Sequence, residues 1–143
     1  MTTGIDTTNQ DMAQRIGNPV VYNMPAGASY GTGNKTYTAA DVVGGIIVHD
    51  GTGGATGTLP TAALMVAGLS MFGSGARIGD TVYCLIINGA NASGTVTLAA
   101  GTGGGFDTNQ GGGSRIIAFG SSKTILVRMT NVTAGSEAYV VYS

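Results

Sequence analysis

Charged side chains are scarce in this sequence. Six basic and seven acidic residues make up 9% of its 143 residues, for a net charge of −1, whereas roughly a quarter of the residues in a typical soluble domain are charged. This balance excludes the basic surface that nucleic-acid binding requires. A lone domain with so few charges is poorly protected against association. The composition therefore favours a protein whose surface is covered by copies of itself or by a partner. The alternative is a Thr- and Gly-rich β-protein kept soluble by its hydroxyl groups.

Cysteine, histidine and long apolar runs are scarce as well. The one cysteine, Cys84, stands in the middle of an apolar stretch, which predicts a small buried side chain without a disulfide. The one histidine, His49, is followed by a glycine-rich turn and is expected at the surface. No apolar run approaches the roughly 20 residues that span a bilayer, and the N-terminus lacks the pattern of a signal peptide. We therefore expect synthesis in the cytoplasm and no association with a membrane.

Glycine is abundant, with 26 residues, but it forms no nucleotide-binding motif. The pairs that begin at Gly51, Gly73 and Gly101 each lack the third glycine of GxGxxG. The segment Gly27–Gly31 matches G-x-S-x-G around Ser29, but the loop-like sequence after it does not supply the helix that a nucleophile elbow needs. The scattered acids form no metal-ligand cluster. We expect no catalytic, cofactor-binding or metal-binding residues, no small-molecule substrate, and therefore no enzyme.

The stretch Gly79–Ala100 organises the predicted fold. Its first half, Asp80–Asn88, is expected to be a strand with two apolar faces, which are formed by Val82, Cys84 and Ile86 and by Tyr83, Leu85 and Ile87. Thr95–Ala100 alternates as a half-solvated strand does, and Gly89–Gly94 supplies the turn of a hairpin. The second apolar face of the first strand then requires cover, either from a helix predicted at Thr61–Leu69 or from a neighbouring subunit.

About eight short strands separated by Gly- and Thr-rich turns predict an all-β fold. We expect an antiparallel β-sandwich, jelly-roll-like, with one or two short helices that Thr38 and Thr61 cap. Residues 19–143 are predicted to form this domain, and residues 1–18 an N-terminal arm or a disordered tail. The other strands are expected at Val20–Met24, Lys35–Thr38, Ile46–His49, Arg115–Phe119, Thr124–Asn131 and Ala138–Tyr142.

Several segments resemble a β-domain found in tailed-bacteriophage virion surface proteins. They are Thr58–Ala62, Gly79–Asn88, Thr95–Gly103 and the closing stretch Leu126–Tyr142. The resemblance covers roughly Tyr37–Tyr142. It implies a capsid decoration (cement) protein or a head- or tail-fibre protein, typically a homotrimer, and no catalytic residues. The insertion Gly111–Gly113 departs from the pattern and leaves the role of the loop 101–113 open.

The leading expectation is therefore a phage capsid decoration protein, made in the host cytoplasm and located on the virion surface. As a homotrimer it would bind the major capsid protein on the outside of the assembled shell and stabilise it. We expect the N-terminal arm to contact capsid subunits through Ile5, Met12 and Ile16, because an ordering arm covers much area with few residues. The alternative is a trimeric fibre, spike or receptor-binding module whose glycine-rich loops form the recognition surface.

Overall fold

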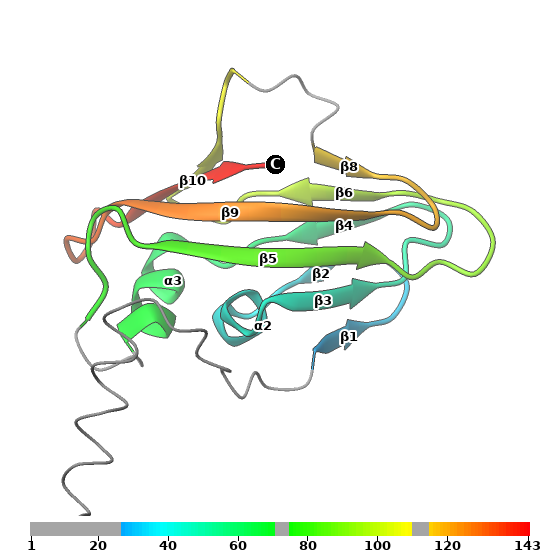
Figure 1. Cartoon of the computed structure of the whole chain (residues 1–143), viewed down its shortest axis with the longest axis horizontal. Helices are drawn as coiled ribbons and strands as arrows, with labels where there is room; N and C mark the ends of the chain where they lie inside the picture. Colours follow the sequence, from blue (N-terminus) through cyan, green and yellow to red (C-terminus); the bar gives the residue numbers. More distant parts are fainter. Residues whose placement is uncertain (1–26, 71–74, 110–114) are drawn as a thin grey trace, which may run out of the picture.

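The computed structural model describes residues 27–70, 75–109 and 115–143. These ranges hold ten strands and two helices, arranged as two sheets with one core between them (Figure 1). The predicted strand Val20–Met24 and the predicted arm, residues 1–18, lie outside the described residues.

Successive strands alternate between the two sheets as far as the ninth strand. The larger sheet has the order β1-β3-β5-β9-β10-β7, and the smaller sheet has the order β2-β4-β6-β8. The strands of the larger sheet are β1 (Ala28–Tyr30), β3 (Ile46–His49), β5 (Thr81–Asn88), β7 (Gly104–Phe106), β9 (Ser122–Asn131) and β10 (Ala138–Tyr142). Those of the smaller sheet are β2 (Lys35–Thr36), β4 (Ala55–Thr58), β6 (Val96–Ala99) and β8 (Ile116–Ile117).

The prediction of an all-β, antiparallel, jelly-roll-like sandwich is wrong, because both sheets are mixed. β1, β3 and β5 run parallel, as do β2, β4 and β6, and β7 runs parallel to β10. Among the described strands, only the pairs that β9 makes with β5 and β10, and that β8 makes with β6, are antiparallel. The physical reason is the alternation. A chain that crosses to the other sheet before it returns re-enters the first sheet from the same end, which produces parallel neighbours.

The predicted hairpin over Gly79–Ala100 does not form either. β5 belongs to the larger sheet and β6 to the smaller one, so the turn Gly89–Gly94 connects the two sheets. The half-solvated pattern of β6 is confirmed, since Val96 and Leu98 are buried and Thr97 is exposed.

Two short helices, α2 (Ala39–Gly44) and α3 (Ala62–Leu69), follow strands of the smaller sheet. Each begins at the first alanine of a Thr-Ala-Ala sequence whose threonine is the N-cap, and both predicted caps are confirmed. The Thr38 hydroxyl accepts the Asp41 N–H at 3.2 Å, and the Asp41 carboxylate accepts the Thr38 N–H at 3.0 Å. The Thr61 hydroxyl accepts the Leu64 N–H at 3.3 Å. Each bond satisfies a backbone N–H that the first helical turn leaves without a partner.

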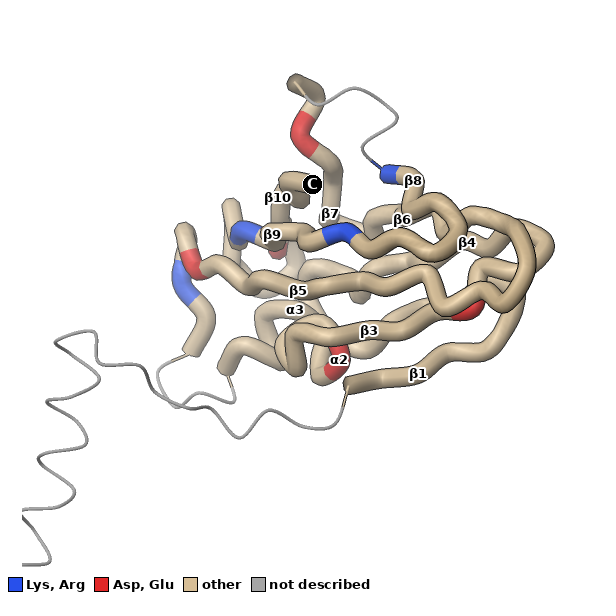
Figure 2. The backbone as a smooth tube through the Cα atoms, turned by 45° about the vertical axis from the view of Figure 1, so that its right-hand side comes forward, with Lys and Arg blue, Asp and Glu red and all other residues tan. Residues whose placement is uncertain are grey.

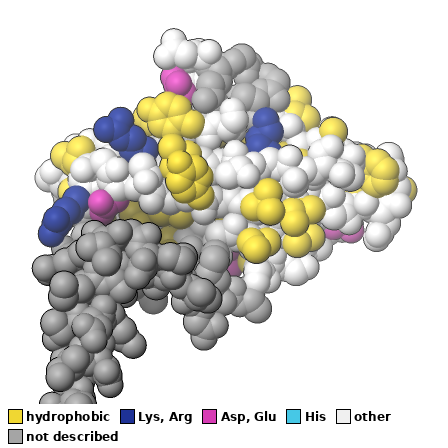
Figure 3. All heavy atoms as spheres, in the orientation of Figure 1, with side chains coloured by type: hydrophobic (Ala, Val, Ile, Leu, Met, Phe, Trp, Pro, Cys, Tyr) yellow, Lys and Arg dark blue, Asp and Glu magenta, His cyan; other side chains and the backbone are white. Residues whose placement is uncertain are grey.

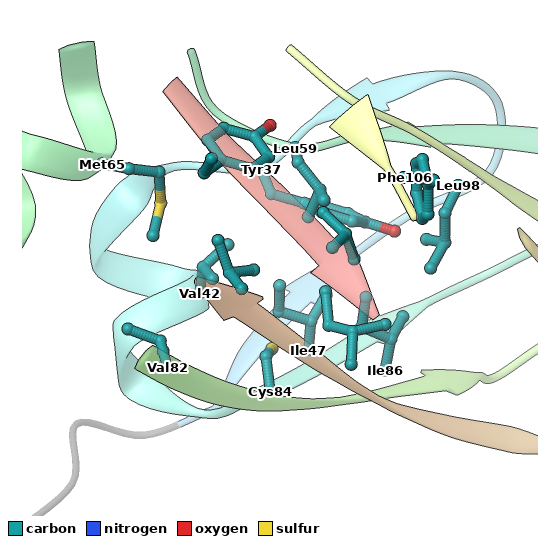
Figure 4. Close-up of a cluster of buried hydrophobic side chains, with 14 of the residues drawn as sticks. Tyr37, Val42, Ile47, Leu59, Met65, Val82, Cys84, Ile86, Leu98 and Phe106 are labelled. Carbon is teal, nitrogen blue, oxygen red and sulfur yellow. The ribbon is translucent and has the colours of Figure 1, made fainter. Parts of the chain in front are cut away.

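The core lies between the sheets and includes side chains from both helices (Figure 4). Burying each large aliphatic side chain contributes about 1.5–3 kcal/mol relative to exposure. Cys84 is fully buried, as the sequence predicts. The fully buried side chains with the largest volumes include Tyr37, Tyr139, Ile47, Leu59, Met65, Ile86, Leu98, Ile117, Ile125 and Met129.

One buried polar side chain, Asn88 at the end of β5, fastens the loops at that end of the sheets. Its Oδ1 accepts the N–H groups of Gly51 and Ala90, each at 3.1 Å. Its Nδ2 donates to the carbonyl oxygens of Gly94 and Ile117, also at 3.1 Å. Both polar atoms of the amide are thus satisfied, as burial demands.

Candidate functional site

A buried aromatic cluster contains the histidine. His49 is fully buried, so the expectation that it lies at the surface is wrong. Its Nε2 lies 2.9 Å from the Gly33 carbonyl oxygen, and its Nδ1 lies 2.7 Å from the Tyr37 hydroxyl. Because a carbonyl oxygen only accepts, Nε2 carries a proton, and in the neutral imidazole Nδ1 then accepts from the Tyr37 hydroxyl. Both ring nitrogens are therefore occupied by structural hydrogen bonds, and neither is available to a substrate.

A tyrosine–carboxylate pair adjoins this cluster. The Tyr30 ring lies 5.1 Å from the Tyr37 ring, and its hydroxyl donates to the Asp41 carboxylate. Burial, together with this hydrogen bond and the negative charge of Asp41, raises the pKa of Tyr30 to about 12. Burial alone would raise the pKa of Asp41, but hydrogen bonds from Thr38 and Tyr30 outweigh it and leave that pKa below its ordinary value. The pair holds β1 against the start of α2.

The G-x-S-x-G match does not place its serine near a base. Ser29 lies on β1 opposite Val48, whereas Tyr30 lies opposite His49. Successive side chains of a strand point to opposite faces, so Ser29 faces outward and His49 faces the core. Ser29 and His49 therefore do not form a nucleophile–base pair.

A shallow hollow of about 470 Å³ lies between the start of α3 and two turns, and it is lined by Thr61, Ala63, Thr102, Gly103, Gly135 and Glu137. Glu137 is its one titratable side chain, and it accepts the Gly135 N–H at 3.0 Å. Over the described ranges, no group of three His, Cys, Asp or Glu side chains is placed to hold a metal ion. Neither described helix has the length and apolar character that spanning a bilayer requires. The hollow thus brings no acid and base together.

The feature that stands out is the outer face of the six-stranded sheet, on the side away from the core. The strand register places its residues in four rows. They are Ser29, Val48, Ile87 and Ser122; Ile46, Leu85 and Thr124; Tyr83, Leu126 and Tyr142; and Thr81, Arg128 and Val140. We refer to these thirteen residues as the outer face. Figure 3 views the molecule from this side and shows hydrophobic side chains over its central strands.

The centre of the outer face is apolar and accessible. Tyr83 is 67% exposed and Ile46 is 42% exposed, although both belong to strands of the larger sheet. Leu85, Ile87 and Leu126 are only partly buried. Tyr83 belongs to a row that crosses three neighbouring strands, in which Leu126 and Tyr142 are partly exposed, and such a row differs from the single apolar side chains that every protein surface carries.

Helix α3 does not cover this face. Its buried side chains, Ala62 and Met65, belong to the core, and it packs against α2 and β10. Of the two covers that the sequence leaves open for Tyr83, Leu85 and Ile87, the helix is therefore excluded, and the described chain leaves Tyr83 uncovered.

The outer face also carries almost no charge. Arg128 is its one charged residue, and it lies in a marginal row, between Thr81 and Val140. Figure 2 shows how thinly charged positions are spread over the described backbone. A surface with this composition suits contact with another apolar surface, because charged groups are depleted at the centres of protein interfaces.

The residues predicted to contact a partner, Ile5, Met12 and Ile16, lie outside the described residues. The sequence predicts three members of the outer face, all on β5, as an apolar face that requires cover, but it does not predict the members on the neighbouring strands. The available signal was the apolar second face of Ala138–Tyr142, on which Val140 and Tyr142 both lie.

Comparisons with protein-family models, with curated proteins and with solved structures found no match to this chain.

Proposed function

We propose that this chain is a structural protein of a bacteriophage virion, a capsid decoration protein that binds the outside of the assembled shell as a homotrimer. The observation that carries the proposal is the exposed, nearly uncharged outer face on a chain with only thirteen charged residues. An apolar patch of this extent is often a site of contact with other proteins. The resemblance of residues 37–142 to virion surface domains supplies the kind of partner.

The proposed mechanism is stabilisation by mass action. A protein that binds only the assembled shell lowers the free energy of that shell relative to its dissociated subunits. Three-fold symmetry lets one modest contact act three times, so that weak individual contacts give tight attachment. The role needs no bound cofactor and no catalytic group.

The N-terminal arm completes the proposal. Residues 1–18 would extend from the domain to neighbouring capsid subunits, with Ile5, Met12 and Ile16 as apolar anchors. Deletion of residues 1–18 is then expected to weaken shell binding without changing the stability of the domain. Undiminished shell binding by the deleted chain would refute this part of the proposal.

The test of the whole proposal mixes the purified chain with empty shells of the phage that encodes it. We expect the chain to sediment with the shells at a saturating ratio and to raise the temperature at which they dissociate. Tail fibres of the same phage serve as the comparison. Binding to fibres or to host cells, with none to shells, would contradict the proposal and favour a fibre or receptor-binding module.

A further inference from the structure

The two sheets present outward faces of different character. On the smaller sheet, Thr36 lies beside Thr58, and Thr97 lies between Thr56 and Ile116, which is 46% exposed. Hydroxyl groups outnumber this one large apolar side chain and suit contact with water. On the larger sheet the corresponding surface is the outer face, with Tyr83, Leu126 and Tyr142 across its centre. The larger sheet therefore carries the more apolar of the two outward faces.

Charge determines what kind of surface suits the outer face. A partner recognised by charge would need several ionic groups on this face, and the face carries only Arg128 at its margin. Asp80, next to Thr81 at the start of β5, already accepts the Arg77 N–H at 2.7 Å within its own turn. The matching surface is therefore apolar at its centre and nearly uncharged. The outer face itself has this composition, so it suits contact with the outer faces of neighbouring copies.

The size of the face points to more than one neighbour. Strands about 4.8 Å apart and rows about 6.7 Å apart give the thirteen residues a projected area of roughly 400 Å². A stable pairwise interface buries about 800 Å² on each partner. The outer face supplies about half of that area, so it forms the apolar centre of a contact that surrounding surfaces complete. A closed ring allows each copy to touch two others in this way.

We infer that the outer face is the contact between copies of this chain, with the faces of three copies turned toward a common axis and Tyr83 near that axis. The number three rests on the proposed function, whereas the choice of the face rests on its composition and exposure.

The test measures mass in solution by sedimentation equilibrium, with the whole chain. Tyr83→Lys adds a charge at an exposed position, so it should leave the fold intact, which the unfolding curve checks. We expect the wild type to be trimeric. The protein concentration at which half of the trimers dissociate should be at least 100-fold higher for the variant than for the wild type. The matched control is Thr97→Lys, which adds the same charge to the exposed side of the smaller sheet and should leave the trimer unchanged.

A covalent readout supports the same test. A chain with Cys84→Ser and Tyr83→Cys carries its one thiol at the exposed position on the outer face. Mild oxidation should link two copies of this chain through a disulfide. The same design with Thr97→Cys in place of Tyr83→Cys should give no disulfide-linked pair, except at concentrations so high that random collisions between molecules form disulfides.

The outcomes separate this inference from the proposed function. A monomeric wild type, or a trimer that Tyr83→Lys leaves unchanged, overturns the inference. If that unchanged trimer also loses shell binding, the outer face contacts the capsid and the proposed function stands. If Tyr83→Lys dissociates the trimer but the wild type binds no shell, the inference holds and the proposed function fails.

Discussion

The Tyr37 hydroxyl donates a hydrogen bond to His49 Nδ1 over 2.7 Å in the interior of the molecule. Tyr37 follows directly on β2 of the smaller sheet, and His49 ends β3 of the larger sheet. The bond therefore fastens the two sheets together, and it explains why the only histidine of the chain is buried.

Tyr37→Phe should destabilise the protein by about 1–3 kcal/mol, because it leaves Nδ1 of a fully buried imidazole without a donor. Urea unfolding followed by fluorescence or circular dichroism measures the loss. Tyr30→Phe is the control, since the Asp41 carboxylate that it abandons keeps its bonds to Thr38. An equal decrease in the free energy of unfolding in the two variants would contradict the importance assigned to the buried hydrogen bond.

Asn88→Ala should cost about 2–5 kcal/mol, since it leaves two backbone N–H groups and two carbonyl oxygens without the amide that joins them. Asn91→Ala removes the same side chain from an exposed turn position nearby and should change the unfolding free energy by less than about 0.5 kcal/mol. Urea midpoints at constant m-value measure both effects. A mild effect at position 88 would mean that the loops hold together without this side chain.

Two adjacent glycines of β7 should respond differently to alanine. A Cβ at Gly104 would lie 2.1 Å from Cζ of the Tyr139 ring, whereas a Cβ at Gly105 meets no atom within 4 Å. Tyr139 cannot yield freely, because its hydroxyl donates to the Pro60 carbonyl at 2.9 Å and accepts the Gly101 N–H at 3.0 Å. Gly104→Ala should cost about 1–3 kcal/mol, and Gly105→Ala should be nearly neutral. Thermal melts measure the melting temperatures of both variants against the wild type, and equal melting temperatures for the two variants would contradict the prediction.

Stability should fall in alkaline solution. Burial raises the pKa of the Cys84 thiol from its ordinary 9.0 to about 12, and burial also raises the pKa values of Tyr37 and Tyr139. A group whose pKa is higher in the folded state keeps its proton there while the unfolded chain loses its own. The stabilisation is therefore fully present below pH 9 and decreases as the pH rises toward 12.

Cys84→Ala isolates the thiol contribution between about pH 8.5 and 9.5, where tyrosines of the unfolded chain are still mostly protonated. In this interval the slope of unfolding free energy against pH should be shallower in the variant than in the wild type. In addition, a thiol reagent should modify Cys84 only in unfolded molecules, because the side chain is fully buried. Rapid modification of the native protein would contradict the burial.

The sequence predicted the features that depend on residues close together in the chain, but it did not predict how strands far apart in the chain pair. The caps at Thr38 and Thr61 and the strand Ile46–His49 follow from side chains that act within a few residues. The choice of sheet for β5 and β6 does not, because the turn residues of Gly89–Gly94 suit a hairpin as well as a crossover. The short strands β1 and β4 fall in segments that read as glycine-rich loops, and neighbouring strands in the sheets stabilise them as strands.

The candidate surface illustrates the same limit. The two apolar faces of β5 were visible in the sequence, but which face is covered depends on α2 and on the strands of the smaller sheet, whose packing against β5 no local pattern predicts. The burial of His49 likewise depends on Tyr37 and on the Gly33 carbonyl, which local patterning does not bring together. Ile47 and His49 stand two residues apart in β3 and therefore share one face of the strand. This spacing was the available signal that the imidazole could face inward with Ile47.

The central row of the outer face also fixes an order between folding and association. It joins Tyr83 to Leu126, which stands 43 residues later, and Leu126 to Tyr142, so its three members come from three strands. The row exists only after β5 has paired with β9 and β9 with β10, which are pairings between distant parts of the chain. Contact between copies through the outer face therefore requires chains that have already folded.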